Sequence, residues 1–194
     1  MSFVGLIIPH SLAGQIQANS LNRNEQIESS LEIDSSVYYT DTIIHWMSID
    51  EAMLLQKKEP KKIFMNVYVS WCRWCRQMKD SVFTNKEIAH YINQHFYPVR
   101  FNAEQKETIK FKGRDYKFIN EGDYHVHELS LFLLNYRQSY PGFVVFNEEG
   151  NVIHVRTSTM DVYLTESLLN YYGSNAYQST SFPKFEEEFS GKIP

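Results

Sequence analysis

The sequence predicts an α/β fold with a central mixed sheet flanked by helices, and three observations lead to this prediction. Residues 63–69 form a short apolar run that is typical of a buried strand, and apolar residues at helical spacing follow it as far as residue 92. Residues 96–101 form the next strand-like run, so these two strands should run parallel through a crossover helix. Residues 143–146 and 152–155 are joined by a Gly-containing turn, which predicts an antiparallel hairpin.

Further helices are expected before and after these strands. Residues 43–58 show helical spacing, and Ser48 with Glu51 three residues later forms a capping-box pattern. Residues 164–172 should form the last helix of the domain, which ends at a glycine. Aromatic residues recur in the tail that follows, and they fit a short helix packed on the domain.

The composition is that of one globular domain. The chain has 194 residues, of which 43% are hydrophobic, with 13 Tyr and 13 Phe, so it can bury a sizeable core. Its net charge of -4 lacks the basic excess that nucleic-acid-binding proteins use, so no such partner is expected. With two cysteines the chain is no disulfide scaffold, and a disulfide between them should be one that forms and breaks in turn.

Those two cysteines, Cys72 and Cys75, lie where the first strand leads into a helix. Unpaired N–H groups and the positive end of the helix dipole favour a thiolate at that position, which would activate Cys72. Cys75 lies one turn further on and can close a disulfide with Cys72. Arg73 should also stabilise the Cys72 thiolate, which favours a more oxidising couple. The stretch therefore predicts a redox site.

Two other interpretations of the cysteine pair are weaker. Cys72, Cys75, His90 and His95 have the spacing of a zinc finger. However, histidines five residues apart on a helix point about 140° away from each other, and a chain with ample core does not need a metal in order to fold. Two buried, inert thiols are the other alternative, which the flanking arginines disfavour.

The cysteine stretch resembles the active-site motif of the thioredoxin superfamily. Over about residues 43–173 the wider pattern is similar to that of exported bacterial thioredoxin-like proteins. It consists of Trp46-Met47, Lys61-Lys62-Ile63-Phe64, Trp71-Cys72-Arg73-Trp74-Cys75, Ile92-Asn93, Phe96-Tyr97 and Ser139-Tyr140-Pro141. The resemblance implies a thioredoxin-like fold and a protein-disulfide oxidoreductase without cofactor or metal. In it Cys72 would attack a substrate disulfide and Cys75 would resolve the mixed disulfide.

The resemblance also implies roles for the residues around this pair. In thioredoxin-like folds a cis proline packs against the disulfide, and the residue before it pairs with the substrate backbone; these roles fall to Pro141 and Tyr140. Arg73 and Trp74, which replace the commonest Gly-Pro, would tune the reduction potential and the contact surface next to Trp71. The alternative function is a non-catalytic module that holds extended peptides at Tyr140 and Pro141, with its cysteines oxidised for stability.

Asn66 departs from the family pattern. Thioredoxins usually carry a buried Asp six residues before the first cysteine, where it helps to deprotonate the second, but this chain has Asn66. An amide can form hydrogen bonds and cannot take a proton. We therefore expect Asn66 to support the site from beneath the redox helix, within reach of Cys75 directly or through a water molecule.

The domain organisation follows from the extent of the resemblance. Residues 38–173 are the expected thioredoxin-like domain, residues 1–37 a leader or linker, and residues 174–194 a tail. Residues 3–8 are apolar but too few to span a membrane, and the small residues 11–14 resemble a signal-peptide cleavage region. We expect a periplasmic or otherwise exported monomer, with the cytoplasm as the alternative location. Its partners would be protein thiols or disulfides and a redox partner that restores its active form.

Residues 104–122 are an insertion relative to a minimal thioredoxin. Residues 109–118 alternate around a Gly-containing turn, which predicts a β-hairpin insertion. Its basic side chains fit an acidic partner, although a solvated face is the favoured interpretation. His125 and His127 have no carboxylate or Cys pattern near them, so we interpret them as loop residues before a helix over 127–136, not as metal ligands.

Overall fold

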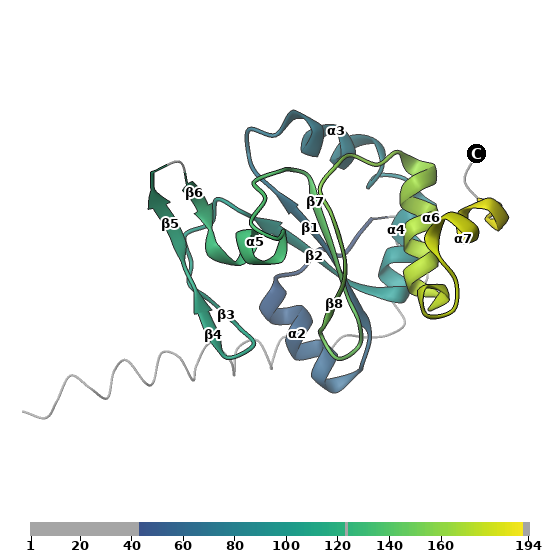
Figure 1. Ribbon diagram of the computed structural model, residues 1–194, viewed down its shortest axis with the longest axis horizontal. Coiled ribbons are helices and arrows are strands. Elements are labelled where there is room, and N and C mark those ends of the chain that lie inside the picture. Colours follow the sequence, from purple (N-terminus) through teal and green to yellow (C-terminus); the bar gives the residue numbers. More distant parts are fainter. Residues whose placement is uncertain (1–42, 123, 192–194) are drawn as a thin grey trace, which may run out of the picture. The chain divides into compact units, whose positions relative to one another are not determined.

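The computed structural model describes residues 43–122 and 124–191. A four-stranded sheet lies at the centre of this part of the chain (Figure 1). These residues belong to one of two units into which the chain divides, the one that spans residues 37–194. The strand order is β2–β1–β7–β8, with β1 (Lys62–Tyr68), β2 (Phe96–Asn102), β7 (Gly142–Phe146) and β8 (Val152–Arg156). β1 and β2 are parallel, whereas β7 is antiparallel to both β1 and β8. The predicted mixed sheet is confirmed, and the predicted leader over 1–37 lies outside the described residues.

Helices cover this sheet, and their bounds differ in part from the predictions. They are α2 (Ile49–Lys58), α3 (Arg73–Ser81), α4 (Lys86–His95), α5 (Glu128–Leu133), α6 (Val162–Gly173) and α7 (Phe182–Glu188). α2 begins with the predicted capping box: the Ser48 hydroxyl accepts the N–H of Glu51 at 3.2 Å, and the Glu51 carboxylate accepts the N–H of Ser48 at 2.7 Å. This cap places the start of α2 at Ile49, six residues after the predicted start at 43. None of the helices in the described ranges has the length and apolar character that a membrane crossing requires.

The alternating side chains of β1 enter two separate apolar clusters. Ile63, Met65 and Val67 pack in one cluster with residues of α2 and α5. Phe64 points the other way and packs with residues of α3, α4 and α6, and its ring stacks on that of Phe143 at 6.0 Å. Because this strand is apolar on both faces, it is buried between layers of helices, as the continuous run of apolar residues predicts.

The helix predicted after the cysteines is two helices. α3 ends at Ser81, and α4 begins at Lys86, where the Asn85 side chain accepts the N–H groups of Glu87 and Ile88 at 3.0 and 3.2 Å. Asn is a favoured N-cap residue because its side-chain oxygen satisfies these otherwise unpaired donors. The apolar spacing continues across the break, so the periodicity alone does not reveal it.

The insertion contains two hairpins, whereas the sequence predicts one. β3 (Ile109–Phe111) pairs with β4 (Arg114–Tyr116) around Gly113, whose φ of 81° suits a glycine, and this confirms the predicted turn. β5 (Phe118–Glu121) then pairs with β6 (Tyr124–His127) and extends the insertion beyond residue 122. The second hairpin was missed because its strands have only four residues each, and Phe118 was assigned to the first hairpin.

His125 and His127 lie in β6, so their prediction as loop residues is wrong. Because β6 pairs with β5 as a strand, their spacing of two residues places both histidines on one face of it. His127 is buried and caps α5, since its Nδ1 accepts the N–H of Leu129 at 3.2 Å. The helix ends at Leu133 rather than at 136, because Asn135 and Tyr136 adopt positive φ angles of 54° and 61°.

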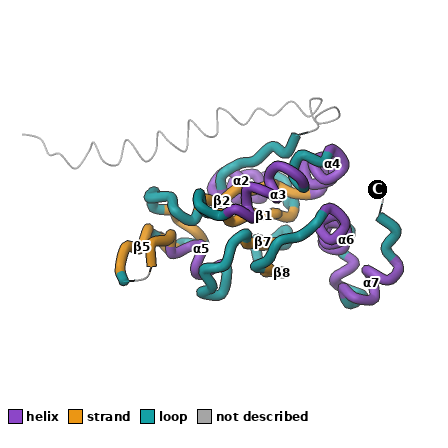
Figure 2. Tube along the Cα trace, turned by 90° about the horizontal axis from the view of Figure 1, so that it is seen from above, coloured by secondary structure: helices purple, strands orange, loops and turns teal. Residues whose placement is uncertain are grey.

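The tail packs on α6 through aromatic side chains, as the sequence predicts. Figure 2 shows α7 beside α6, and the rings of Phe182 and Phe185 each lie 5.2 Å from that of Tyr171. The Tyr171 hydroxyl also donates to the carbonyl of Thr180 at 2.6 Å. α7 therefore belongs to the same aromatic cluster as the last helix of the sheet layer.

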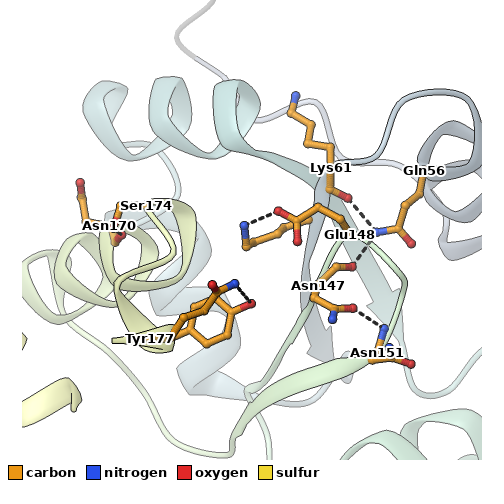
Figure 3. Close-up of polar contacts among 10 residues, drawn as sticks. Gln56, Lys61, Asn147, Glu148, Asn151, Asn170, Ser174 and Tyr177 are labelled. Carbon is orange, nitrogen blue, oxygen red and sulfur yellow. Dashed lines mark hydrogen bonds and ion pairs between the residues drawn. The ribbon is translucent and has the colours of Figure 1, made fainter. Parts of the chain in front are cut away.

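The turn between β7 and β8 is held to the start of β1 by polar contacts. The Gln56 side chain of α2 donates to the carbonyls of Lys61 and Asn147 at 2.7 and 2.9 Å (Figure 3). Next to it, Lys62 forms an ion pair with Glu148 at 2.5 Å; the side chain of Lys62 is 4% exposed and that of Glu148 33%. The cation is thus the buried partner of this pair.

This difference in burial predicts unequal effects of removing each partner. We expect Glu148→Ala to lower the free energy of unfolding by about 3 kcal/mol, because it leaves a buried ammonium group without a counter-charge. Lys62→Met should cost about 1 kcal/mol or less, since the remaining carboxylate reaches water and the Met side chain fills the space. Urea unfolding at neutral pH measures both, and Glu149→Ala on the same turn is the matched control.

The pH dependence of the same pair gives a second measurement. Burial acts to raise the pKa of Glu148, but the hydrogen bond and the charge of Lys62 outweigh it and hold this pKa below its ordinary value of 4.5. A lowered carboxyl pKa contributes stability above the ordinary value that is lost as the pH falls through the folded-state pKa. The destabilisation by Glu148→Ala should therefore shrink in acid. Equal losses of unfolding free energy in Glu148→Ala and Lys62→Met at neutral pH would contradict the inference that the buried Lys62 needs its counter-charge more than Glu148 does.

Candidate functional site

The two cysteines form a disulfide at the amino end of α3. Their Cα atoms are 5.3 Å apart, and both side chains are buried. Cys72 is the N-cap residue of α3, and its Sγ accepts the N–H of Cys75 at 3.0 Å. Such an N–H group would also stabilise a thiolate on Cys72 after reduction, together with the helix dipole. The position of Cys72 at a helix start is the one that the sequence predicts.

The turn that carries Cys72 is held from two sides. The N–H of Ser70 donates to Oε2 of Glu104 at 2.5 Å, and the carbonyl of Ser70 accepts from Nη1 of Arg76 at 2.8 Å. Glu104 follows β2, and the parallel pairing of β2 with β1 brings the carboxyl ends of both strands together. Sequence reasoning missed Glu104, although its place directly after a strand parallel to β1 is a signal that could have found it.

Two tryptophans of the motif lie on the surface beside the buried disulfide. Trp71 is 68% exposed and Trp74 is 55% exposed, and Arg73 between Cys72 and Trp74 is exposed as well. The Trp71 ring meets the Tyr140 ring edge-on, with centroids 6.2 Å apart. Uncovered aromatic side chains around a site are typical of a surface that contacts another molecule.

Pro141 and Tyr140 lie where the sequence places them, directly before β7. The Tyr140–Pro141 peptide bond is cis, and Pro141 is buried. The next residue, Gly142, pairs with Val67 near the carboxyl end of β1. The proline therefore lies at the same end of the strands as the cysteine turn, which follows β1. Burial raises the pKa of Tyr140; a hydrogen bond with Ser130 acts against this rise, and the charge of Glu104 adds to it.

Asn66 lies on the face of β1 that α3 covers. It lies two residues after Phe64 and therefore on the same face of the strand, and Phe64 packs in the cluster that includes Met78 of α3. Asn66 is 4% exposed, and its Nδ2 donates to the carbonyl of Gly142 at 3.4 Å. The predicted position beneath the redox helix agrees with this face, and the reach from Asn66 to Cys75 stays a prediction.

The four residues of the zinc-finger spacing are not brought together in the structure. Cys72 and Cys75 are joined to each other, His90 is exposed on α4, and the ring of His95 packs on Tyr91 at 4.2 Å. Burial lowers the pKa of His95, and the charges of Lys61, His90 and Lys62 lower it further. Within the described ranges no cluster of three or more His, Cys, Asp or Glu side chains is placed to hold a metal ion.

Sequence comparisons relate the chain to a family and to longer proteins. Residues 29–140 match the family model Thioredox_DsbH, which is described as a protein of unknown function, DUF255. Spermatogenesis-associated protein 20 of Rattus norvegicus is 39% identical over 59 residues, and that of Homo sapiens is 34% identical over 59 residues. These alignments cover 30% of this chain and 8% of those proteins, so the chain spans a small part of the curated relatives that it matches.

Three solved structures with the same fold are similar to this chain. A protein titled DsbH oxidoreductase has a TM-score of 0.50 at 18% identity, over 74% of this chain and 92% of that one. A thioredoxin-fold protein from Helicobacter pylori has a TM-score of 0.52 at 17% identity, over 80% and 97% of the two chains. A thioredoxin from Thermus thermophilus has a TM-score of 0.50 at 12% identity, over 68% and 88%. With its thioredoxin-like fold and more than half of its length matched by one family model, the chain belongs to the Thioredox_DsbH family within the thioredoxin superfamily.

Proposed function

We propose that this protein is a thiol–disulfide oxidoreductase that exchanges disulfides with protein substrates through Cys72 and Cys75. The observation that carries the proposal is the disulfide itself, at the amino end of α3, with the sulfur of Cys72 facing the N–H of Cys75. A thiolate on Cys72, whether it attacks or is displaced, is stabilised by the helix start, and Arg73 adds a positive charge beside it. The low-pKa thiol of such a pair is the one that attacks.

The exchange proceeds in two balanced steps. In the reduced protein the Cys72 thiolate attacks one sulfur of a substrate disulfide; a mixed disulfide forms, and the other substrate sulfur leaves as a thiolate. Cys75, as a thiolate, then attacks the sulfur of Cys72, the Cys72–Cys75 disulfide forms, and the second substrate sulfur is released. Two electrons pass to the substrate, whose two sulfurs end as thiols after taking up two protons. The reverse sequence oxidises a dithiol, and a thiol–disulfide partner restores the starting form.

The surface beside the disulfide supports a polypeptide as the substrate. Trp71 and Tyr140 present an aromatic pair next to the cysteine turn, and the backbone of Tyr140 is the segment that the family resemblance assigns to the substrate chain. A non-catalytic peptide-binding module would use the same surface with its disulfide permanently closed. Turnover of a peptide disulfide in the presence of dithiothreitol distinguishes the two, because a binding module would leave the uncatalysed rate unchanged.

Alkylation of the reduced protein tests which cysteine attacks. We expect a limiting amount of iodoacetamide at about pH 6 to modify Cys72 before Cys75, because Cys72 is the N-cap residue whereas Cys75 lies one turn inside α3. Peptide mapping by mass spectrometry locates the label. In denatured protein, the control, both cysteines should react alike. Earlier modification of Cys75 in the folded protein would reverse the assignment of roles.

A further inference from the structure

Two charged side chains of opposite sign hold the backbone of Ser70 in the turn that leads to the cysteines. Val69 and Cys72 close this turn, since the N–H of Cys72 donates to the carbonyl of Val69 at 3.3 Å. The closing bond uses neither the N–H nor the carbonyl of Ser70, which lies inside the turn. The N–H donates to Glu104 at 2.5 Å, and the carbonyl accepts from Arg76 at 2.8 Å. The side chains therefore supply the partners that the turn itself does not.

Glu104 is the first residue of the insertion, and the backbone around it is fixed by three contacts. Its N–H donates to Oδ1 of Asn102 at 2.9 Å, at the end of β2. The preceding residue, Ala103, donates to the carbonyl of Tyr68 in β1 at 2.8 Å and accepts the N–H of His127 in β6 at 2.7 Å. The backbone that carries the carboxylate is thus tied both to the strand before the cysteines and to the second hairpin of the insertion.

The charge of Glu104 lies close enough to act on the redox pair. Ser70 and Cys72 are two residues apart, so their backbone nitrogens are at most about 7 Å from each other. With the contact of 2.5 Å to Ser70, the carboxylate lies within about 10 Å of the Cys72 nitrogen. That distance is about one Debye length at ordinary ionic strength, so salt does not screen the charge fully. The same charge adds to the rise of the pKa of Tyr140, on the other side of the site.

The sign of this charge opposes that of the cation next to the attacking cysteine. Arg73 favours a thiolate on Cys72, which stabilises the reduced protein and makes the couple more oxidising. A carboxylate near the same sulfur disfavours the thiolate and makes the couple more reducing. The balance between Arg73 and Glu104 therefore contributes to the reduction potential.

We propose that Glu104 is a positioning residue with two separable effects: its hydrogen bond fixes the cysteine turn, and its charge holds the Cys72–Cys75 couple at a more reducing potential. The proposal rests on the thiol–disulfide exchange proposed above and concerns the poise of that same site. It also gives the insertion a function, because the contacts of Ala103 with β1 and β6 hold the backbone from which this carboxylate extends.

Two substitutions separate the hydrogen bond from the charge. Glu104→Gln keeps an oxygen that accepts the N–H of Ser70 and removes the charge, whereas Glu104→Asp keeps the charge and draws the carboxylate back by one methylene group. Each protein is equilibrated with reduced and oxidised glutathione. Reduction of the Cys72–Cys75 disulfide to two thiols then oxidises two glutathione molecules to one glutathione disulfide. Mass spectrometry after alkylation measures the reduced fraction.

We expect Glu104→Gln to shift this equilibrium constant about threefold toward the reduced protein, because the Cys72 thiolate loses a nearby negative charge. The shift should shrink in about 1 M NaCl, where the Debye length falls to about 3 Å. Glu104→Asp should keep the native equilibrium constant and lower kcat/KM for a peptide disulfide about tenfold, because a displaced turn misplaces the attacking sulfur. Glu121→Gln is the matched control: it makes the same change in net charge at the end of β5, away from α3, and should leave both quantities native (Figure 1).

The outcomes distinguish the charge, the hydrogen bond and the proposed function. A native equilibrium constant in Glu104→Gln, or an equal shift in Glu121→Gln, would contradict the effect of the charge. A native kcat/KM in Glu104→Asp would contradict the effect of the hydrogen bond. Absence of exchange with peptide disulfides in every protein, the native one included, would overturn the proposed function, while the glutathione equilibrium would still decide on the charge. Circular dichroism verifies that each variant folds, and Glu104→Ala replaces Glu104→Gln if that variant does not.

Discussion

Cys72→Ser should abolish exchange, whereas Cys75→Ser should arrest the protein as a mixed disulfide with its substrate. A serine hydroxyl stays protonated at neutral pH and does not attack a disulfide, so the first variant loses all turnover. The second variant retains the attacking sulfur at the helix start and lacks the sulfur that would release the substrate. Incubation with a peptide disulfide, followed by non-reducing electrophoresis and mass spectrometry, measures both results.

The double variant, Cys72→Ser with Cys75→Ser, is the matched control because it keeps the aromatic surface and removes both sulfurs. It should bind a peptide disulfide no more tightly than it binds the same peptide without a disulfide, and it should form no covalent product. A mixed disulfide on Cys72→Ser, formed through Cys75, would mean that the assigned order of attack is reversed.

Local signals in the sequence are sufficient for much of this site. The start of the redox helix at Cys72 could be predicted, because the strand before it and the apolar spacing after it are both local patterns. The cap of α2 was found in the same way, from Ser48 and Glu51 three residues apart. Features of this kind depend on neighbours in the chain, so one sequence contains the information that they need.

The parallel pairing of β1 with β2 was predicted, but side-chain contacts between distant segments were not. Glu104 reaches Ser70 only because β2 lies parallel to β1, and Met160 faces α3 only because α6 packs on that side of the sheet. The break between α3 and α4 was not predicted for another reason: the apolar residues before and after it keep the same helical spacing. The strands of the second hairpin have only four residues each, which is too short for a clear alternation of apolar and polar residues.

The second large effect concerns the proton of Cys75. In the native chain Asn66 offers no base, so Cys75 has to lose its proton to solvent or to the departing thiolate. Resolution of the mixed disulfide should therefore be slow near neutral pH and become faster as the pH rises. Asn66→Asp places a carboxylate on the face of β1 that α3 covers, where it can take that proton. We expect the resolving step to become about 100-fold faster near neutral pH, the size of effect typical of a positioned general base.

The same substitution should destabilise the fold. Asn66 is 4% exposed and donates to the carbonyl of Gly142, and an ionised carboxylate cannot donate there. The cost is about 1–3 kcal/mol for a buried acceptor left without its donor. Burial raises the pKa of such a carboxyl above about 3.9, although Arg100, its register neighbour on β2, limits the rise. The folded state then binds the proton more tightly than the unfolded state, so the penalty grows as the pH rises above about 4.

Stopped-flow measurement of the resolving step between about pH 6 and 9, with thermal unfolding at each pH, tests both parts in one set of samples. Asn66→Ala is the matched control, because it also loses the hydrogen bond to Gly142 and supplies no base. It should melt below the native protein and keep the native pH profile of resolution, whereas Asn66→Asp should flatten that profile by raising its neutral limb. A lower melting temperature without faster resolution would mean that residue 66 supports the packing beneath α3 and has no part in the proton path. Equal rates and equal melting temperatures in all three proteins would place this side chain out of reach of Cys75 altogether.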